Sequence, residues 1–356
     1  MRPAQATIDL KALCLNYQLA SSLSGSKAIA VIKADAYGHG AVECARALEK
    51  ETKVFAVAFL EEALELREAG ILNPILLLEG FFEECELAQI DQYNLWPVIH
   101  SHWQISAIEK AKLLKPLTIF LKMDSGMHRV GFFPEDIPVA YYQLLATKKI
   151  ANTTLMTHFA RADELEIDYT KKQYSAFQEV ANKLNLETCV CNSPALLAWP
   201  EIKSHWVRPG IMLYGASPFE HPQHSTNQLQ PVMTLQSKII SVRTLPQGES
   251  IGYGGLYTTN KPSRIGVVAM GYADGYPRHA PNDTPIMVAG EKTRLIGRVS
   301  MDMLTVDLTD LPQAGLGSDV ELWGKNILAS DVALLAQTIP YQLFCNIKRV
   351  PRRFTS

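Results

Sequence analysis

Between residues 27 and 215, short apolar runs rich in β-branched residues alternate with amphipathic stretches. The run KAIAVIK (27–33) is followed by VECARALEK (42–50), and VFAVAFL (54–60) is followed by EEALELREAG (61–70). Six further apolar runs come later: PILLLEG, LWPVIH, LTIFLKMD, TTLMTHF, TCVCN and WVRPGIMLYG. Near-continuous apolar strands are typical of a parallel sheet covered by helices. Because the number of runs is close to eight, the pattern predicts a (β/α)8 barrel of the TIM type and favours it over an open doubly wound sheet.

The regular alternation ends at residues 217–231, SPFEHPQHSTNQLQP, which are rich in proline and polar residues. The segments beyond it alternate apolar and polar residues and are separated by Gly, Pro, Asn and Asp: TLQSKIISVRTL, SRIGVVAMGY, TPIMVAG, TRLIGRVSMDMLTVDLT and DVELWG. Such segments are typical of a mainly β domain. We therefore predict a barrel domain over residues 1–220, whose first few residues can join the second domain, and a mainly β domain over residues 221–356.

Composition is typical of a globular protein that acts on small molecules. Apolar residues make up 47% of the 356 residues and charged residues 20%, with a formal net charge of −2 and no block of Lys or Arg. This balance argues against partners such as nucleic acid or an anionic membrane. The N-terminal residues MRPAQATIDLKAL lack the apolar core of a signal peptide, and no segment reaches the ~18 consecutive apolar residues of a membrane span. We expect a cytoplasmic protein.

The cysteines are spread along the chain. They are Cys14, Cys44, Cys85, Cys189, Cys191 and Cys345, of which one pair forms a C-x-C motif. This spacing fits neither a disulfide framework nor a zinc knuckle, so we interpret all six as reduced packing residues. Cys189 and Cys191 could hold a soft metal if histidines converged on them, but on a strand they simply point to one face.

In a parallel barrel the chemistry lies at the carboxyl ends of the strands, so polar residues that end an apolar run are the candidates. These are Lys33, Lys122, His158, Asn192 with Ser193, and Arg208. Lys33 ends the run AIAVI. An ammonium held partly away from water there loses proton affinity, which suits nucleophilic or Schiff-base chemistry. The alternative is a lysine that extends its amine from the strand end into solvent.

The segment AVIKADAYGHG (30–40), which contains Lys33, resembles the lysine signature of the alanine racemases, a family that uses pyridoxal phosphate (PLP). Further segments resemble that family in family order: KMDSGMHRVG, THFARADE, NSPA, WVRPGIMLYG, IGYGGLY, GYADGYPR and GRVSMDM. The resemblance covers essentially the whole chain. It implies a PLP-binding barrel followed by a β domain, interconversion of L- and D-alanine, and a homodimer with shared active sites.

The resemblance assigns two catalytic bases. Lys33 would bind PLP as a Schiff base and act on one face of the substrate Cα, while Tyr253 of the partner subunit would act on the other face. Taken alone, Tyr253 beside Gly252 and Gly254 is more often an aromatic residue of a turn. A phenol with an ordinary pKa near ~10 is also a poor base at neutral pH unless its neighbours favour the phenolate.

His158 and Arg208 resemble these neighbours, and in the family they link the tyrosine to the pyridine nitrogen of PLP. A guanidinium can only donate, which leaves that nitrogen unprotonated and the ring a weaker electron sink. Without the family, His158 is a core histidine, Arg208 an ion-pair residue and Gly210 a turn residue after Pro209. Further cofactor contacts that the resemblance implies, chiefly to the phosphate, are Tyr37, Asn192, Ser193, Gly210, Ile211 and Tyr341.

Arg129 resembles the residue that binds the substrate carboxylate, together with Met301 and Asp302 of the second subunit. The resemblance also implies that Lys122 is carbamylated to N6-carboxylysine, an anion that would orient Arg129. The alternative is an ordinary lysine paired with Asp124.

Four residues resemble those that keep the entrance of the active site narrow in this family. They are Tyr272 and Tyr341, with Arg278 and Asp163 farther out. A small pocket of this kind favours alanine over bulkier amino acids.

Other functions stay open at this point. A single-barrel PLP-homeostasis protein would share the barrel and the lysine, but residues 232–356 argue against it. A PLP decarboxylase of the same two-domain fold and a broad-specificity or lysine racemase are further alternatives. The motifs fit D-alanine supply for peptidoglycan and alanine catabolism equally well. The segment EGFFEECE (79–86) departs from the family pattern, which we interpret as a local loop difference.

Overall fold

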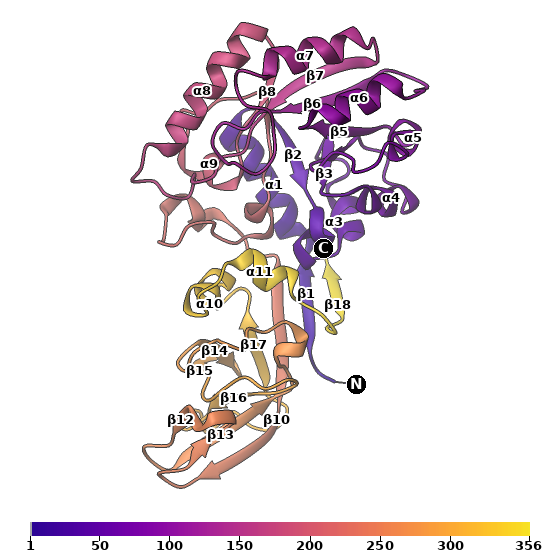
Figure 1. Ribbon diagram of the computed structural model, residues 1–356. Helices are drawn as coiled ribbons and strands as arrows, with labels where there is room; N and C mark the ends of the chain where they lie inside the picture. Colours follow the sequence, from indigo (N-terminus) through magenta and orange to yellow (C-terminus); the bar gives the residue numbers. More distant parts are fainter. Residues whose placement is uncertain (1) are drawn as a thin grey trace.

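Eight parallel strands close into a barrel in the order in which they follow one another along the chain. A computed structural model describes residues 2–356 (Figure 1). The barrel strands are β2 (Lys27–Val31), β3 (Val54–Val57), β4 (Ile75–Leu77), β5 (Leu95–Ile99), β6 (Leu117–Lys122), β7 (Ile150–Met156), β8 (Glu187–Cys189) and β9 (Trp206–Val207). β9 pairs with β2 at Lys27 and Ala28, which closes the ring. Each predicted apolar run forms one barrel strand, so the predicted fold class is confirmed.

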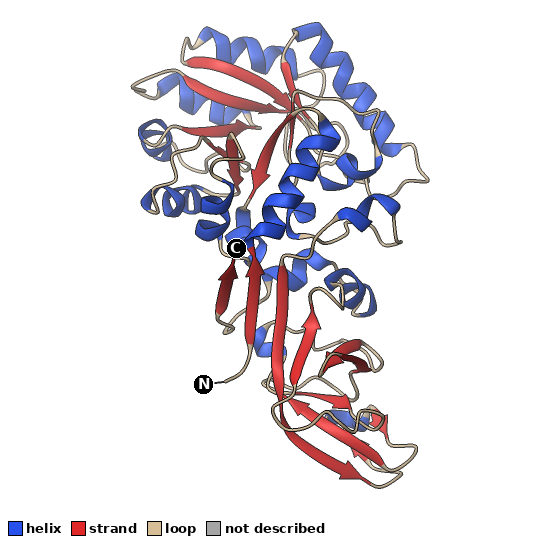
Figure 2. Ribbon diagram, turned by 180° about the vertical axis from the view of Figure 1, so that it is seen from behind, coloured by secondary structure: helices blue, strands red, loops and turns tan. Residues whose placement is uncertain are grey.

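Helices cover the outside of the barrel (Figure 2). They are α1 (Leu10–Ser24), α3 (Ala41–Leu48), α4 (Leu60–Glu68), α5 (Glu86–Gln92), α6 (His102–Lys110), α7 (Ile137–Ala146), α8 (Tyr169–Leu184) and α9 (Ser193–Ala198). The short element α2 (Lys33–Gly38) instead follows β2 at the mouth of the barrel. Strands β3 and β4 are buried at every position, because helices lie outside them and the barrel core lies inside. Over residues 2–356, no helix has both the length and the apolar character needed to cross a membrane.

The second domain is built on an eight-stranded sheet. Its strands are β1 (Gln5–Asp9), β10 (Met233–Leu245), β13 (Ser263–Val268), β14 (Pro285–Val288), β15 (Glu291–Arg294), β16 (Leu304–Asp307), β17 (Asp319–Trp323) and β18 (Arg352–Thr355). β1 pairs antiparallel with β10 and parallel with β18, so the first and last strands lie side by side below the barrel in Figure 1. A hairpin of β11 (Ser250–Ile251) and β12 (Tyr257–Thr258) carries Tyr253 in its turn.

Two short helices of the second domain, α10 (Ala329–Leu335) and α11 (Pro340–Cys345), lie between its sheet and the barrel (Figure 1). α11 packs against α2 of the barrel. A methyl group built on Gly38 would stand 2.2 Å from the carbonyl oxygen of Phe344, so only glycine permits this approach. The second domain therefore supplies a helix to the mouth of its own barrel.

One predicted β segment is interrupted. In TRLIGRVSMDMLTVDLT, residues 297–303 form a loop between β15 and β16. Gly297 has a φ of +72° and lies against the carbonyl of Ile251, and the carbonyl of Ser300 accepts a hydrogen bond from the Tyr272 N–H at 3.0 Å. The alternating pattern does not become a strand here because these backbone contacts reach other loops.

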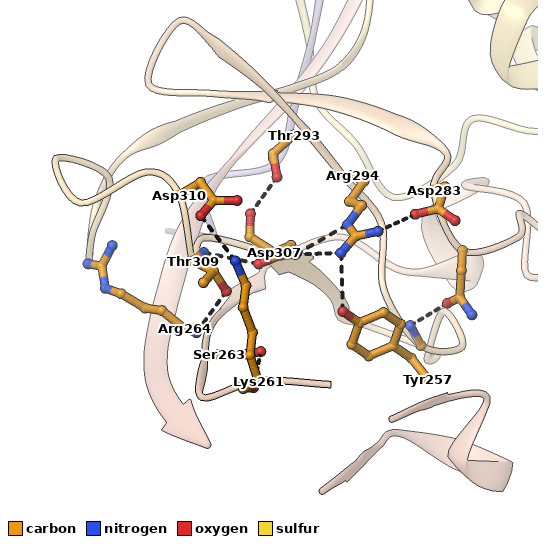
Figure 3. Close-up of polar contacts among 12 residues, drawn as sticks. Tyr257, Lys261, Ser263, Arg264, Asp283, Thr293, Arg294, Asp307, Thr309 and Asp310 are labelled. Carbon is orange, nitrogen blue, oxygen red and sulfur yellow. Dashed lines mark hydrogen bonds and ion pairs between the residues drawn. The ribbon is translucent and has the colours of Figure 1, made fainter. Parts of the chain in front are cut away.

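Arg294 joins the hairpin that carries Tyr253 to the sheet of the second domain (Figure 3). Its Nη2 donates to Asp307 Oδ2 at 2.9 Å and to Tyr257 Oη at 3.2 Å, and its Nη1 donates to Asp283 Oδ1 at 2.7 Å. Hydrogen bonds to charged groups are among the stronger ones in proteins. The network holds the hairpin, and with it Tyr253, in a defined place.

All six cysteines carry free thiols. Cys44, Cys189 and Cys191 are buried as packing residues, but Cys85 and Cys345 are exposed. The packing interpretation is therefore wrong for these two residues. Cys85 immediately precedes α5 and Cys345 ends α11, and both positions are exposed to solvent.

Candidate active site

A cavity of about 380 Å³ lies at the carboxyl ends of the barrel strands. Its lining includes eleven of the predicted site residues: Lys33, Tyr37, Lys122, Arg129, His158, Asn192, Ser193, Arg208, Gly210, Ile211 and Tyr341. All come from the barrel domain except Tyr341, which comes from α11. A larger cavity of about 930 Å³ lies between α1 and α8 at the opposite end of the barrel. Barrel enzymes do not place their chemistry at that end, and its lining contains none of the predicted residues.

Lys33 starts α2, which is not an ordinary helix. Ala34, Asp35, Ala36 and Tyr37 have φ between 52 and 54° and ψ between 42 and 50°, so the turn is left-handed. This conformation is uncommon for residues other than glycine, and strain of this kind gathers at functional sites. Because Lys33 begins the turn and Tyr37 is its last left-handed residue other than glycine, one strained turn brings both side chains to the cavity.

Neutral hydrogen-bond donors gather in part of the cavity. The Gly210 N–H donates to Ser193 Oγ at 2.9 Å, just before the 3-10 helix η1 (Ile211–Tyr214), so the Ser193 hydroxyl proton is free to point elsewhere. A methyl group built on Gly210 would stand 2.7 Å from Tyr37 Oη, so glycine permits the close approach of the backbone to this phenol. The rings of Tyr37 and Tyr341 are 5.9 Å apart, and burial raises the pKa of both phenols, which therefore stay protonated. Hydroxyl and amide donors of this kind suit a phosphate group.

Arg208 is buried, and main-chain carbonyls hold its guanidinium. Nη1 donates to the Cys189 carbonyl at 2.9 Å and Nη2 to the Thr157 carbonyl at 2.7 Å. Nη2 also lies 3.3 Å from His158 Nδ1, so this nitrogen accepts and the ring proton sits on Nε2. Burial, followed by the charges of Arg208 and Lys122, holds the pKa of His158 well below its ordinary value. The site thus contains a fixed cation beside a neutral imidazole.

Lys122 ends β6 and is only 6% exposed. Burial lowers its pKa to about 7, and the positive charges of Arg208 and Arg129 contribute to this shift. Asp124, the alternative partner of Lys122, instead accepts a hydrogen bond from the His128 N–H at 3.0 Å and pairs with the His128 ring at 3.4 Å. Lys122 is therefore a buried amine that is about half neutral at pH 7 and largely neutral at pH 8.

The structure places the remaining second-domain residues outside this cavity: Tyr253, Met301, Asp302, Tyr272 and Arg278. The side chain of Tyr253 is 70% exposed on its hairpin, and β12 lies at the end of the second domain that is remote from the barrel (Figure 1). The loops of Tyr272 and Met301 are neighbours, because the Ala273 N–H donates to the Met301 carbonyl at 3.0 Å. Tyr272 and Arg278 line a separate pocket of about 330 Å³.

The sequence prediction misses six residues of the cavity lining, and two of them, Glu79 and Cys345, carry ionisable side chains. Glu79 is the lone carboxylate of the lining within residues 2–356. It follows the run PILLL, so the strand-end rule that identifies Lys33 identifies it as well, and EGFFEECE is more than a local loop difference. No strand-end pattern marks Cys345, because it ends a helix of the second domain. Asp163, the last predicted residue, is exposed. The pKa of Tyr341 is raised mainly by the burial of its own phenol and secondly by the negative charge of Asp163.

The closed barrel, the lysine at its mouth and the following β domain define a two-domain barrel enzyme. Two family models together match most of the chain: "Alanine racemase, N-terminal domain" matches residues 8–218, and "Alanine racemase, C-terminal domain" matches residues 232–354. The chain belongs to the alanine racemase family, a family of isomerases.

Individual relatives agree with this assignment. An alanine racemase of Pseudomonas taetrolens is 63% identical over 354 residues, which cover 99% of each chain. An enzyme of Pseudomonas putida named as a catabolic alanine racemase is also 63% identical over 354 residues and 99% of each chain. The crystal structure of the biosynthetic alanine racemase from Pseudomonas aeruginosa is 44% identical, covers 100% of both chains and has a TM-score of 0.95 to this structure.

Proposed function

We propose that the protein interconverts L-alanine and D-alanine with PLP as its cofactor. The observation that carries this proposal is the cavity in which Lys33 faces an anion cradle of neutral donors and the buried cation Arg208. Membership of the alanine racemase family supports alanine as the substrate. When bound, PLP supplies the electron withdrawal that makes the substrate Cα–H acidic enough to be removed.

The residues of the cavity fit this cofactor. Lys33 would supply the amine for the covalent link, and Arg208 would donate to the pyridine nitrogen, because a guanidinium cannot accept a proton. The phosphate would be held by Tyr37, Ser193, Gly210, Ile211 and Tyr341, next to Asn192. Glycine at position 210 lets the backbone approach Tyr37 Oη closely, which brings these donors together. A cavity of about 380 Å³ is small for a cofactor with a substrate, which favours a small amino acid.

Racemisation requires that a proton leave one face of Cα and return on the other. Lys33 Nζ would hold and transfer the proton on one face. The hairpin of Tyr253 lies far from the barrel of the same chain, so the partner subunit's Tyr253 would serve the other face (Figure 1). Arg208 beside a neutral His158 gives the site a positive potential, which favours the phenolate form of an approaching tyrosine.

Two exposed apolar surfaces support a head-to-tail homodimer. The first surrounds the barrel mouth, after β3, β4, β5 and β6, and consists of Phe59, Phe82, Trp103 and Phe133. The second lies on the β domain and consists of Tyr253, Leu256, Met301 and Met303. Exposed apolar patches of this kind mark interaction sites. Packing each barrel mouth on the β domain of the other subunit would bury both surfaces in a closed pair and deliver Tyr253 to the cavity.

The same packing would complete the substrate site. Arg129 lines the cavity, and its planar donor fork suits the alanine carboxylate, with the partner's Met301 N–H and Asp302 on the other side. Tyr341 would narrow the entrance together with Asp163 and with Tyr272 and Arg278 of the partner subunit.

Lys122 is expected to be carbamylated when carbon dioxide is present. The neutral amine attacks the carbon of CO₂ and releases one proton, which converts the nitrogen into a carbamate anion beside Arg129. Because the pKa of Lys122 is lowered to about 7, the reaction should proceed at pH 8 and fade well below pH 7, where the amine is protonated. ¹³C-bicarbonate with NMR detection should give a carbamate signal that a Lys122→Arg variant lacks. A wild-type sample at pH 8 without that signal would show that Lys122 stays an amine.

The proposed activity is tested by incubating the purified protein and PLP with L-alanine or L-lysine, and measuring the D-enantiomer and released carbon dioxide. D-alanine without carbon dioxide is the expected result. Carbon dioxide would indicate a decarboxylase, comparable turnover of L-lysine a broad-specificity racemase, and tight PLP binding without turnover a cofactor-binding protein.

We also propose that the enzyme serves alanine breakdown. The relative named as catabolic shares 63% of its residues with this chain, whereas the biosynthetic one shares 44%. Deleting the gene in its host should slow growth on L-alanine as sole carbon source without creating a need for added D-alanine. A deletion strain that cannot grow without D-alanine would show that the enzyme supplies D-alanine instead. Complementation with the gene for the Lys33→Ala variant is the matched control.

A further inference from the structure

The left-handed turn of Ala34–Tyr37 needs support from outside itself. Its four residues adopt left-handed φ and ψ values, and none of them is glycine. For such residues this conformation is less favourable than the right-handed form. A turn that positions both Lys33 and Tyr37 is therefore held by contacts that its own sequence does not supply.

Several of these contacts hold the ends of the turn. Glu62 Oε1 accepts a hydrogen bond from the Ala34 N–H at 2.5 Å. Asp35 accepts one from the Ala41 N–H at 2.7 Å and pairs with Arg352 of β18 at 2.5 Å. These bonds satisfy donors at the start and beyond the end of the turn, and none of them reaches its last carbonyl groups.

His39 reaches those carbonyl groups. Its Nδ1 lies 3.0 Å from the carbonyl oxygen of Ala36 and 2.9 Å from that of Tyr37. The ring is completely buried between Tyr214, at 4.5 Å between ring centroids, and Phe344, at 4.9 Å. Burial lowers the pKa of His39 to about 3, so the ring is neutral and carries one proton. Both neighbours of Nδ1 are acceptors, which places that proton on Nδ1.

The state of Nε2, the other ring nitrogen of His39, also indicates that the Nδ1–H is the reason for a histidine at this position. Within residues 2–356, Nε2 of His39 is buried and has no hydrogen-bond partner. Buried polar atoms are usually satisfied, so the fold keeps a histidine here although one of its nitrogens is unpaired. A phenylalanine would fill the same aromatic space between Tyr214 and Phe344 without that penalty. The Nδ1–H is what distinguishes histidine from such a residue.

We propose that His39 is a positioning residue, whose Nδ1–H locks the left-handed turn through two carbonyl groups and so fixes Tyr37 and Lys33 in the cavity. The His39 ring also packs indirectly against the Tyr37 ring, because the Tyr214 ring lies between them, with its centroid 4.8 Å from that of Tyr37 and 4.5 Å from that of His39. The effect on the cofactor rests on the proposed PLP function. The effect on the turn does not, since it concerns the protein alone.

Three variants separate the hydrogen bond from the packing of the ring. His39→Asn keeps an N–H donor near the position of Nδ1 and loses the ring. His39→Phe keeps the ring and loses the donor, and His39→Ala loses both. The first measurement is hydrogen–deuterium exchange of the peptide that covers residues 34–41, in protein stripped of cofactor. The second is the rate at which PLP leaves the loaded enzyme, followed by its absorbance in the presence of a PLP scavenger.

His39→Phe and His39→Ala are expected to speed both exchange and PLP loss by roughly ten- to a hundredfold. The Tyr37 carbonyl loses the Nδ1–H donor, and the Ala36 carbonyl keeps only the backbone N–H of residue 39, at 3.0 Å. His39→Asn should stay within about threefold of the wild type. A His39→Phe protein that matches the wild type, or a His39→Asn protein no better than His39→Ala, would overturn the proposal. If His39→Asn does not fold, the comparison of His39→Phe with the wild type still decides.

This design also separates the two proposals. A wild-type protein that neither binds PLP nor racemises alanine would rule out the proposed function. Exchange of residues 34–41 in the cofactor-free variants would still show whether the Nδ1–H holds the turn.

Discussion

A Lys33→Ala variant is expected to purify without colour, to bind PLP only weakly, and to lose at least about 10⁴-fold in alanine racemisation, because in the proposed mechanism Lys33 supplies both the covalent link and one of the two bases. The fold should survive. Lys33 is partly exposed, and the alanine removes a cation from a cavity that also contains Lys122, Arg129 and Arg208. Absorbance after PLP addition, melting temperature and D-alanine formation measure the three expectations.

Lys27 provides the matched control, because it lies at the other end of β2. It makes an exposed ion pair with Glu187 at 3.4 Å, and such pairs contribute little to stability. Lys27→Ala should therefore keep its colour and its activity. A colourless Lys27→Ala protein would show that any lysine of this strand matters, and an active Lys33→Ala protein would remove Lys33 from the chemistry.

Mixed dimers are expected to recover activity from two inactive proteins. Tyr253→Phe alone should lose about 10²–10⁴-fold in racemisation, since the phenol that moves the proton on one face is gone. When Lys33→Ala and Tyr253→Phe subunits are unfolded and refolded together, a hybrid dimer contains one site with both defects and one with neither. Random pairing makes half of the dimers hybrids, so about a quarter of wild-type activity should return if each site draws on both subunits.

The control for this experiment pairs Lys33→Ala with a Lys33→Ala/Tyr253→Phe double variant, a mixture in which every site lacks the lysine. It should stay inactive. No recovery in the first mixture, with hybrid dimers demonstrated by a mass or affinity tag, would mean that Tyr253 serves its own chain or is not a base. The exposed position of Tyr253, remote from its own barrel, predicts recovery.

Much of the barrel could be predicted because its strands are buried on both faces and appear as uninterrupted apolar runs. The same reasoning located Lys33, Lys122, His158 and Arg208, since a polar residue that ends such a run must lie at the barrel mouth. Applied consistently, it would also have included Glu79. Local sequence thus predicts that a residue lies at a strand end. Its chemical role is predicted only by the family resemblance.

Other parts of the site depend on contacts between distant segments. ADAY is built from ordinary residues, two of them alanines that favour the right-handed helix, so nothing local predicts a left-handed turn at residues 34–37. The turn exists because His39, Glu62 and Arg352 hold it. Cys345 and Tyr341 reach the cavity only when the second domain packs on the barrel, a step that no single segment encodes.

The pairing of β1 with β10 and β18 has a consequence during synthesis of the protein. The ribosome makes Gln5–Asp9 long before its two neighbours in the sheet, Met233–Leu245 and Arg352–Thr355. At about 5–20 residues per second, the opening strand waits on the order of tens of seconds with both edges unpaired. The barrel can close during this interval, whereas the sheet below it can be completed only after Arg352–Thr355 has left the ribosome. Nascent chains stalled before residue 352 should therefore carry an open strand edge that chaperones can bind.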